Sequence, residues 1–253
     1  MNVLEVENVS QSFGGLKVLE GVSFRMEAGE RVGLIGPNGA GKTTLIKVLS
    51  GHLPCQSGRI HLLGQEVTNM LPHRRTSLGL ARSFQINTLF PNLSLLNNVL
   101  LAVQGTKPAR FQMLRPITAY GDNFARAKEL LELVGLWEKR DDLITVLSHG
   151  QQRQVEILLA LASQPKLLML DEPSAGLSTA ETAGFIDMMH SLTAGTTLFF
   201  CAHDMNLVFS LAERVMVLYY GGIIAQGTPK EIQNNPQVRE IYLGMQAENA
   251  QAS

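Results

Sequence analysis

Residues 36–43 read Gly-Pro-Asn-Gly-Ala-Gly-Lys-Thr and match G-x-x-x-x-G-K-[ST], the spacing of the phosphate-binding loop called Walker A. The glycines let backbone N–H groups face phosphate oxygens, Lys42 reaches the β- and γ-phosphates, and Thr43 offers a hydroxyl to Mg²⁺. Residues 31–35 before the loop predict a strand, and residues 44–49 after it predict a helix. The phosphates would then lie at a helix N-terminus, which favours anions. The predicted nucleotide-binding residues of this loop are Gly36, Pro37, Asn38, Gly39, Ala40, Gly41, Lys42, Thr43 and Thr44.

A second group of residues carries two carboxylates. The apolar residues 167–170 are followed by Asp171 and Glu172. A buried strand beside the phosphate loop would deliver Asp171 to the Mg²⁺ shell, whereas Glu172 points elsewhere because strand side chains alternate. Glu172 is therefore a candidate general base that polarises an attacking water. Phosphoryl transfer needs little beyond a metal, a positioned water and charge stabilisation, so the two motifs together predict nucleotide hydrolysis.

Composition limits the classes of protein to which the chain can belong. Its 253 residues support one large domain or two small ones, and 45% hydrophobic with 17% charged residues is typical of a globular chain. The net charge of −1 indicates no general affinity for nucleic acid, and we expect no nucleic-acid partner. Cys55 and Cys201 form no metal or redox spacing, which fits a reducing compartment, and Cys201 is expected in a buried strand. We find no secretory signal and no run of 18 apolar residues, so any membrane role is expected to come through a partner.

The order of predicted elements indicates an α/β core with an insertion. Strands are predicted at residues 3–9, 22–26, 31–35, 58–63, 167–170, 197–202 and 215–218. Helices near 179–192 and 204–212 separate the last three strands, which is the βαβ rhythm of a parallel sheet. Three further helices are predicted at 94–103, 119–134 and 150–163. We therefore expect one domain over residues 1–245, with a core of about 1–89 and 164–235, a helical insertion of about 90–163, and a polar tail at 246–253.

With both motifs placed, the sequence between and around them resembles ABC-type ATPases. Residues 147–154, Leu-Ser-His-Gly-Gln-Gln-Arg-Gln, resemble the LSGGQ signature, and residues 174–178 resemble the D-loop. Gln85 falls at the position of the Q-loop, His203 at that of the switch histidine, and Phe13 at that of the aromatic residue against adenine. The chain looks most like the ATPase subunits of branched-chain amino-acid uptake systems. Residues 12–16, 89–103, 203–205 and 241–244 carry that closer match.

The resemblance implies a P-loop NTPase core with a parallel sheet, an antiparallel β subdomain on the N-terminal side and an inserted α-helical subdomain. It implies ATP and Mg²⁺ as ligands, with the metal held by Thr43, Gln85 and Asp171. The catalytic residues that it implies are Glu172, His203, Lys42 and Gln85. Phe13 would stack on the adenine, and Ser148, Gly150 and Gln151 would contact nucleotide. His149 replaces the first glycine of the signature, and whether it touches nucleotide stays open.

The resemblance also implies an assembly. Two ATPase subunits, identical or paralogous, would pack head to tail with ATP between the phosphate loop of one and the signature of the other. Transmembrane permease subunits would bind this pair, and a periplasmic solute-binding protein would act with them indirectly. The chain would then lie peripherally on the cytoplasmic face of the inner membrane, without a transmembrane segment.

The function expected from these features is to power uptake of branched-chain or related hydrophobic amino acids. A urea or short-chain amide importer is the main alternative. A soluble mechanical ATPase, as in DNA repair or translation, usually carries coiled-coil insertions or two cassettes, and neither occurs here. A GTPase would be expected to carry N-K-x-D, but the chain has no Asn-Lys pair. The transported solute, the partner ATPase and the permease subunits cannot be identified from this chain.

Two surface features were also open to interpretation. We expect Arg74, Arg75 and Arg82 to form a solvated face rather than a basic patch. Residues 89–91, Leu-Phe-Pro, would be either hidden core or a surface that receives a helix of a partner.

Overall fold

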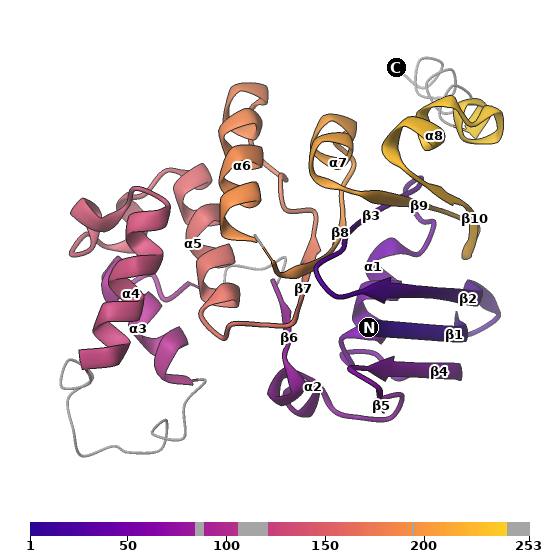
Figure 1. Cartoon of the computed structure of the whole chain (residues 1–253), viewed down its shortest axis with the longest axis horizontal. Helices are drawn as coiled ribbons and strands as arrows, with labels where there is room; N and C mark the ends of the chain where they lie inside the picture. The colour runs from indigo at the N-terminus through magenta and orange to yellow at the C-terminus, as the bar shows by residue number, and fades with distance from the viewer. Residues whose placement is uncertain (84–88, 106–120, 194, 242–253) are drawn as a thin grey trace.

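A computed structural model describes residues 1–83, 89–105, 121–193 and 195–241 of the chain. Its central sheet has six strands in the order β10-β9-β3-β8-β7-β6 (Figure 1). The strands from β9 to β6 run parallel, and β10 pairs antiparallel with β9 at one edge. The bounds are β3 (Arg31–Ile35), β6 (Leu80–Arg82), β7 (Leu167–Asp171), β8 (Thr197–Cys201), β9 (Arg214–Tyr219) and β10 (Gly222–Gly227).

A second, antiparallel sheet has the order β2-β1-β4-β5. Its strands are β1 (Asn2–Phe13), β2 (Leu16–Glu27), β4 (Ser57–Leu62) and β5 (Gln65–Glu66). The turn between β1 and β2 contains Gly14 at φ 59, a left-handed conformation that glycine adopts without steric cost. The parallel core and the antiparallel β subdomain that the sequence predicts are therefore confirmed.

Eight helices are found in the described ranges. They are α1 (Lys42–Leu49), α2 (Pro72–Leu78), α3 (Leu95–Gly105), α4 (Gly121–Leu133), α5 (His149–Leu161), α6 (Thr179–Leu192), α7 (Met205–Leu211) and α8 (Pro229–Asn234). Two short 3-10 turns, η3 (Trp137–Lys139) and η4 (Ile144–Val146), precede α5. Helices α3, α4 and α5 lie together beyond the β6–β7 end of the central sheet (Figure 1) and share a hydrophobic core of their own. No helix within the described residues is long and apolar enough to cross a membrane.

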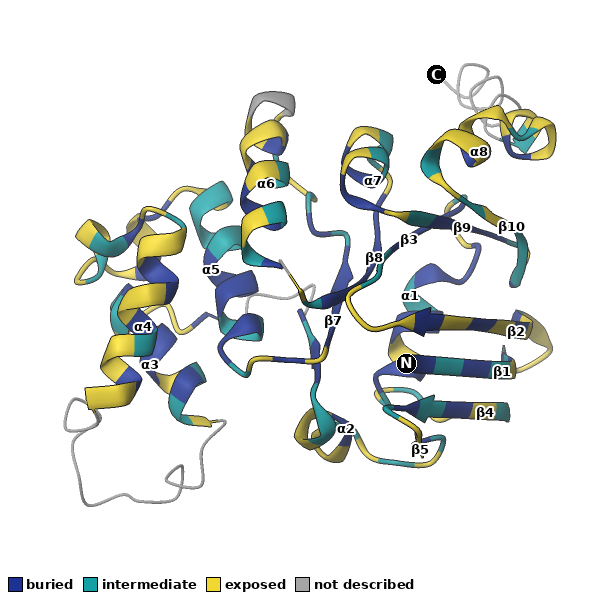
Figure 2. Cartoon of the chain, viewed as in Figure 1, coloured by how far each residue is buried: buried dark blue, intermediate teal, exposed yellow. Residues whose placement is uncertain are grey.

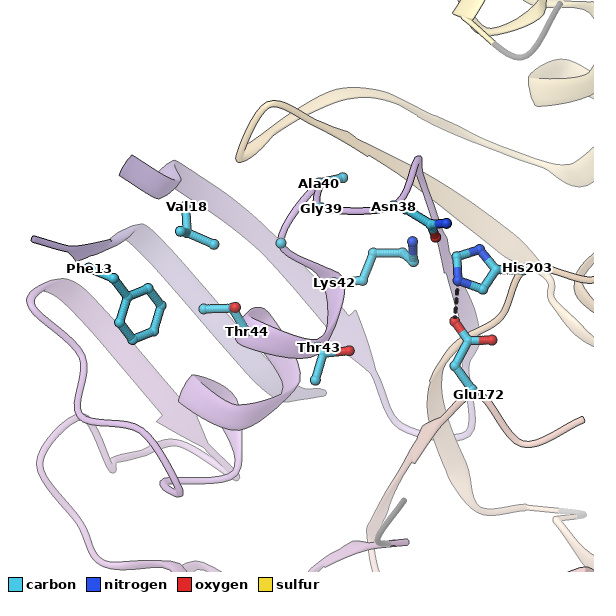
Figure 3. Close-up of a pocket in the computed structure, with 11 residues that line it drawn as sticks. Phe13, Val18, Asn38, Gly39, Ala40, Lys42, Thr43, Thr44, Glu172 and His203 are labelled. Atoms are coloured by element: carbon cyan, nitrogen blue, oxygen red, sulfur yellow. Dashed lines mark ion pairs between the residues drawn. The ribbon is translucent and has the colours of Figure 1, made fainter. Parts of the chain in front are cut away.

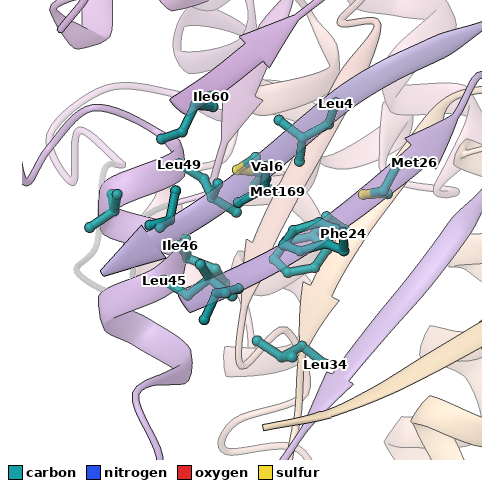
Figure 4. Packing of buried hydrophobic residues seen from close by; sticks show 14 of the residues in the cluster. Leu4, Val6, Phe24, Met26, Leu34, Leu45, Ile46, Leu49, Ile60 and Met169 are labelled. Atoms are coloured by element: carbon teal, nitrogen blue, oxygen red, sulfur yellow. The ribbon is translucent and has the colours of Figure 1, made fainter. Parts of the chain in front are cut away.

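Helix α1 is held in a hydrophobic core that it shares with both sheets. Leu45, Ile46 and Leu49 on α1 are fully buried among side chains of β1, β2, β3, β4 and β7 (Figure 4). Phe24 of β2 stacks on Phe199 of β8 with ring centroids 5.8 Å apart. The core thereby fixes the helix that begins at the phosphate loop. Strands β7 and β8 are buried along their whole length (Figure 2), as expected for central parallel strands that read as continuous apolar runs.

The expectation of a solvated arginine face is wrong for two of the three arginines. Arg74 is exposed, but Arg75 is only 1% exposed and donates hydrogen bonds to four carbonyls, those of Val48, Leu49, Thr68 and Met70. The carbonyls of Val48 and Leu49 close the C-terminus of α1, where helix carbonyls lack intrahelical partners. The side chain of Arg82 is only 7% exposed, and its contacts are described with the site below.

Residues 89–91 were expected to be either hidden core or an exposed surface for a partner, and the structure shows one residue of each kind. Leu89 is buried in the core of the α3–α5 helices, whereas Phe90 is 56% exposed. Asn98 on α3 holds this turn by accepting a hydrogen bond from the Phe90 N–H at 2.8 Å and donating one to the Phe90 carbonyl at 3.1 Å.

Candidate nucleotide-binding site

The phosphate loop runs from the end of β3 to the start of α1, as the sequence predicts. Two of its glycines are required by the packing around the loop. A Cβ at Gly36 would lie 2.1 Å from the carbonyl oxygen of Leu218, and one at Gly41 would lie 2.6 Å from that of Val18. Gly41 also has φ 106, which side chains rarely adopt. Strands β9 and β2 therefore press directly against the loop backbone and fix its path.

Lys42 reaches back across this loop. Its Nζ donates hydrogen bonds to the carbonyl oxygens of Gly36 at 2.7 Å and Pro37 at 3.0 Å. Burial lowers the pKa of Lys42, while the nearby carboxylates of Glu172 and Asp171 act in the opposite direction. The ammonium is thus held over the loop, in the position from which the motif predicts it to reach phosphate.

A cavity extends along the loop (Figure 3). Phe13, the last residue of β1, lies at one end of the cavity and is half-exposed. The Glu172–His203 pair lies at the other end. The order along the cavity is therefore aromatic ring, phosphate loop, carboxylate. The lining residues are Phe13, Val18, Asn38, Gly39, Ala40, Gly41, Lys42, Thr43, Thr44, Glu172 and His203.

Asp171 ends β7 as a fully buried carboxylate beside α1. Its Oδ1 accepts hydrogen bonds from Thr43 Oγ1 at 3.3 Å and from the Cys201 thiol at 2.8 Å. Its Oδ2 accepts no hydrogen bond from the described residues, although Arg82 Nη2 lies 3.5 Å away. Hydroxyl and carboxylate oxygens are the ligands that Mg²⁺ prefers, and the buried Oδ2 has no hydrogen bond from the described residues to use its lone pairs. Thr43 and Asp171 therefore fit a magnesium site.

Cys201 was expected as a buried strand residue, and that expectation is confirmed. Its hydrogen bond to Asp171 was not foreseen. Burial raises the pKa of the Cys201 thiol, and the Asp171 carboxylate raises it further, so the group keeps its proton and acts as a donor.

Glu172 follows Asp171 but turns into the cavity. Its backbone adopts φ 51, and its N–H donates to the Cys201 carbonyl at 2.9 Å, so the chain bends at the end of β7. Glu172 Oε1 lies 3.0 Å from His203 Nε2, on the loop after β8 (Figure 3). Burial raises the pKa of Glu172, while His203 and Lys42 oppose this shift. A partly buried carboxylate with a raised pKa is suited to accept a proton from water.

The signature residues form the start of α5, away from this cavity. Ser148 Oγ accepts from the Gln151 N–H, and Gln151 Oε1 accepts from the Ser148 N–H, which together make a capping box. Ser148, Gly150 and Gln151 are absent from the described lining of the cavity around Lys42. One chain therefore does not bring the phosphate loop and the signature together.

Arg153 on α5 is a contact residue that the motif comparison missed. Its guanidinium donates to the carbonyl oxygens of Glu172 at 2.9 Å and Pro173 at 3.0 Å, which ties α5 to the chain after β7. In the sequence, Arg153 stands two residues after Gln151, and that position does not specify a partner. Gln85 and residues 242–244 lie outside the described part of the chain.

Comparison with known proteins agrees with this geometry. The family model described as ABC transporter matches residues 19–175, and the model described as Branched-chain amino acid ATP-binding cassette transporter matches residues 223–244. The high-affinity branched-chain amino acid transport ATP-binding protein LivG of Salmonella typhimurium is 36% identical, over 96% of this chain and 98% of its own length. BraF of Pseudomonas aeruginosa, which has the same description, is 35% identical over the same shares.

Solved structures show the same fold. The ADP conformation of MJ1267, an ATP-binding cassette of an ABC transporter, has a TM-score of 0.86 at 32% identity and covers 96% of this chain and 99% of its own. The ATP-binding cassette MJ0796, solved as a dimer in a post-hydrolysis state bound to ADP and phosphate, has a TM-score of 0.73 at 25% identity. It covers 89% of this chain and 98% of its own. The chain therefore belongs to the ABC transporter family and is a nucleotide-binding ATPase that is similar to the ATP-binding proteins of branched-chain amino-acid transport.

Proposed function

We propose that this chain is the ATP-hydrolysing subunit of a membrane importer for branched-chain or related hydrophobic amino acids. The observation that carries the ATPase activity is the Glu172–His203 pair, 3.0 Å apart, at the end of the cavity that also contains Lys42 and Thr43. The solute class is supported by the names of relatives that align over 96% of the chain and by the match of residues 223–244.

Within the cavity, we assign Lys42 and the loop residues Gly36 to Thr44 to the phosphates of ATP, and Phe13 to stacking on the adenine. Stacking of a base on an aromatic ring is worth about 1–3 kcal/mol. The proposed ligands of Mg²⁺ are Thr43, Asp171 and Gln85, of which the first two are in contact. When bound, Mg²⁺ supplies neutralisation of the phosphate charge.

The protein groups around the γ-phosphate position divide the remaining tasks. The raised pKa of Glu172 favours its action as the base that takes a proton from the attacking water. His203 holds the Glu172 carboxylate through the 3.0 Å contact, and Lys42 offers positive charge to the phosphates. Glu172 thus faces the phosphates while Asp171, one residue earlier, faces Thr43.

The separation of the signature from the cavity supports an ATP site that two subunits share. We propose a head-to-tail pair, identical or paralogous, in which Ser148, Gly150 and Gln151 of one subunit contact ATP held by the other. The dimer of MJ0796 with ADP and phosphate is a precedent among related cassettes. The helical insertion at about 90–163 would face the permease subunits at the cytoplasmic side of the membrane, and a periplasmic binding protein would deliver the solute.

Reconstitution tests this proposal. The chain is co-expressed with the permease, second-ATPase and binding-protein genes that adjoin its own, and the purified complex is placed in liposomes with ATP on the cassette side. We expect ATP-dependent uptake of labelled leucine, and no uptake with Glu172→Gln. Uptake of urea or a short-chain amide in place of leucine would support the alternative importer. Purification with ribosomes or DNA, and without permease subunits, would contradict transport.

A further inference from the structure

A closed ring of contacts joins both ends of helix α1 to one carboxylate. At the first turn of α1, Thr43 Oγ1 donates to Asp171 Oδ1 at 3.3 Å. Just after the last turn, Ser50 Oγ accepts a hydrogen bond from Arg82 Nη1 at 3.2 Å. Arg82 Nη2 closes the ring, because it lies 3.5 Å from Asp171 Oδ2. The ring passes through α1, β6 and β7, and the proposed magnesium ligands Thr43 and Asp171 are adjacent members of it.

Both charged members of the ring are withdrawn from water. The side chain of Arg82 is 7% exposed and that of Asp171 is fully buried. Burial lowers the pKa of Arg82, and the Asp171 carboxylate opposes that shift. Buried charges are costly unless they are paired, so each of these two groups requires the other to stay in place.

The geometry uses a property that arginine has and lysine lacks. Two different nitrogens of one planar guanidinium contact two different elements, Nη1 at the end of α1 and Nη2 at the end of β7. Ser50 is itself anchored, because its hydroxyl lies 2.7 Å from the Ile46 carbonyl within α1. Strand β6 is itself tied to β7, because it pairs with that strand and the Ser83 N–H just after it donates to the Met169 carbonyl at 3.0 Å. Arg82 therefore links the end of α1 to the end of β7.

We propose that Arg82 is a positioning residue of the ATPase site, which holds Asp171 at the correct distance from Thr43 without itself touching nucleotide. This inference rests on the proposed function, in which Thr43 and Asp171 bind Mg²⁺. Magnesium demands near-ideal octahedral geometry, so two protein ligands serve it only if their separation is fixed. Partners behind metal ligands typically change metal affinity by about 10–100-fold when they are removed.

If Arg82 were only a countercharge for Asp171, its removal would change the Mg²⁺ affinity in the opposite direction. If Arg82 only neutralised Asp171, its guanidinium would compete with a cation for Oδ2, and its removal would strengthen Mg²⁺ binding. A positioning role requires that its removal weaken Mg²⁺ binding.

Binding of a fluorescent, non-hydrolysable ATP analogue to the full chain separates these roles. The affinity for the analogue is first measured in EDTA. It is then measured at increasing Mg²⁺, to find the free Mg²⁺ concentration at which half of the Mg²⁺-dependent increase in affinity is reached. For Arg82→Met we expect this concentration to rise by about tenfold, with unchanged affinity in EDTA. Arg82→Lys should give a smaller rise, because an ammonium keeps a charge for Asp171 but cannot also reach Ser50. Arg74→Met removes an exposed arginine from α2 and should change neither quantity.

Two further variants keep the outcomes distinct. Thr43→Ala and Asp171→Asn should abolish the effect of Mg²⁺; if they do not, the proposed metal site is wrong. If they do and Arg82→Met shows an unchanged or lower Mg²⁺ requirement, the positioning role is wrong. Should Arg82→Met fail to fold, Ser50→Ala tests the same ring by removing the anchor of Arg82, and an unchanged Mg²⁺ requirement in both Ser50→Ala and Arg82→Lys would overturn the proposal.

Discussion

The carboxylate of Glu172 and the imidazole of His203 meet at one end of the cavity, with Oε1 and Nε2 3.0 Å apart. They follow neighbouring parallel strands, β7 and β8, whose carboxyl ends lie at the same edge of the sheet. Glu172 and His203 are 31 positions apart in the sequence, and the pairing of the two strands brings them into one site.

This pairing predicts the pH dependence of hydrolysis. Burial raises the pKa of Glu172, so the carboxyl stays protonated to a higher pH than an ordinary glutamate and the acid limb of kcat is displaced upward. His203 acts to lower that pKa, so His203→Ala should move the acid limb to still higher pH. The measurement is kcat at saturating ATP across pH. As a control, His73→Ala alters an exposed histidine on α2 and should leave the acid limb of kcat in place. If the acid limb does not move in His203→Ala either, His203 does not lower the pKa of Glu172.

Lys42→Met should weaken ATP binding in the full chain. A charge-assisted hydrogen bond is worth about 1.5–3 kcal/mol, which corresponds to an affinity loss of about 10–100-fold. The measurement is equilibrium binding of a fluorescent ATP analogue. Lys47→Met removes an exposed lysine from the same helix and should bind normally. Equal affinity in the two variants would show that Lys42 does not contact phosphate.

The capping boxes allow a test of the shared ATP site. Ser148, Ser178 and Thr228 each cap a helix in the same way, so alanine at any of them should cost about 1 kcal/mol of stability. Ser148→Ala should also reduce ATPase activity in the assembled pair of cassettes, because Ser148 is proposed to contact the partner's nucleotide. Thr228→Ala is the matched control and should keep full activity. Equal ATPase rates in these two variants would show that Ser148 does not contact the partner's nucleotide.

Arg75→Met should destabilise the fold. Four carbonyls would lose a buried donor, and each unsatisfied group costs about 1–3 kcal/mol. Relaxation of the chain would reduce the sum, and we expect a loss of about 3–5 kcal/mol in the free energy of unfolding. Urea unfolding followed by circular dichroism measures this loss. Arg74→Met should stay within about 0.5 kcal/mol of the unaltered chain, and a similarly small change in Arg75→Met would contradict the structural role.

The sequence predicted the features of this fold that depend on local spacing. The phosphate loop, the apolar strand before Asp171 and the helices of the insertion follow from patterns within about ten residues, and the structure contains them. The short elements α2, β6 and β10 were not predicted. They have three to seven residues of mixed character, which is too short for a periodic pattern to stand out, and the pairing partner of β6 lies far along the chain in β7.

The contacts that complete the site were also invisible in the sequence. Cys201 and Asp171 are hydrogen-bonded across two strands, and Arg82 reaches both Asp171 and Ser50. Each residue type has an ordinary alternative on a surface or in a core, and only the tertiary arrangement selects the partner. The strand alternation that separates Asp171 from Glu172 was predicted, but the bend at Glu172 that brings it to His203 was not.

The most direct test of the account is ATP hydrolysis by Glu172→Gln in the assembled importer. Phosphate release and binding of a fluorescent ATP analogue are measured on the same preparation, beside the unaltered complex. Loss of the general base should reduce kcat by about 10²–10⁴-fold, while the affinity for ATP stays unchanged because glutamine preserves the shape of the side chain. Phosphate release at the normal rate by a variant that still binds ATP would contradict the assignment of Glu172 as the base.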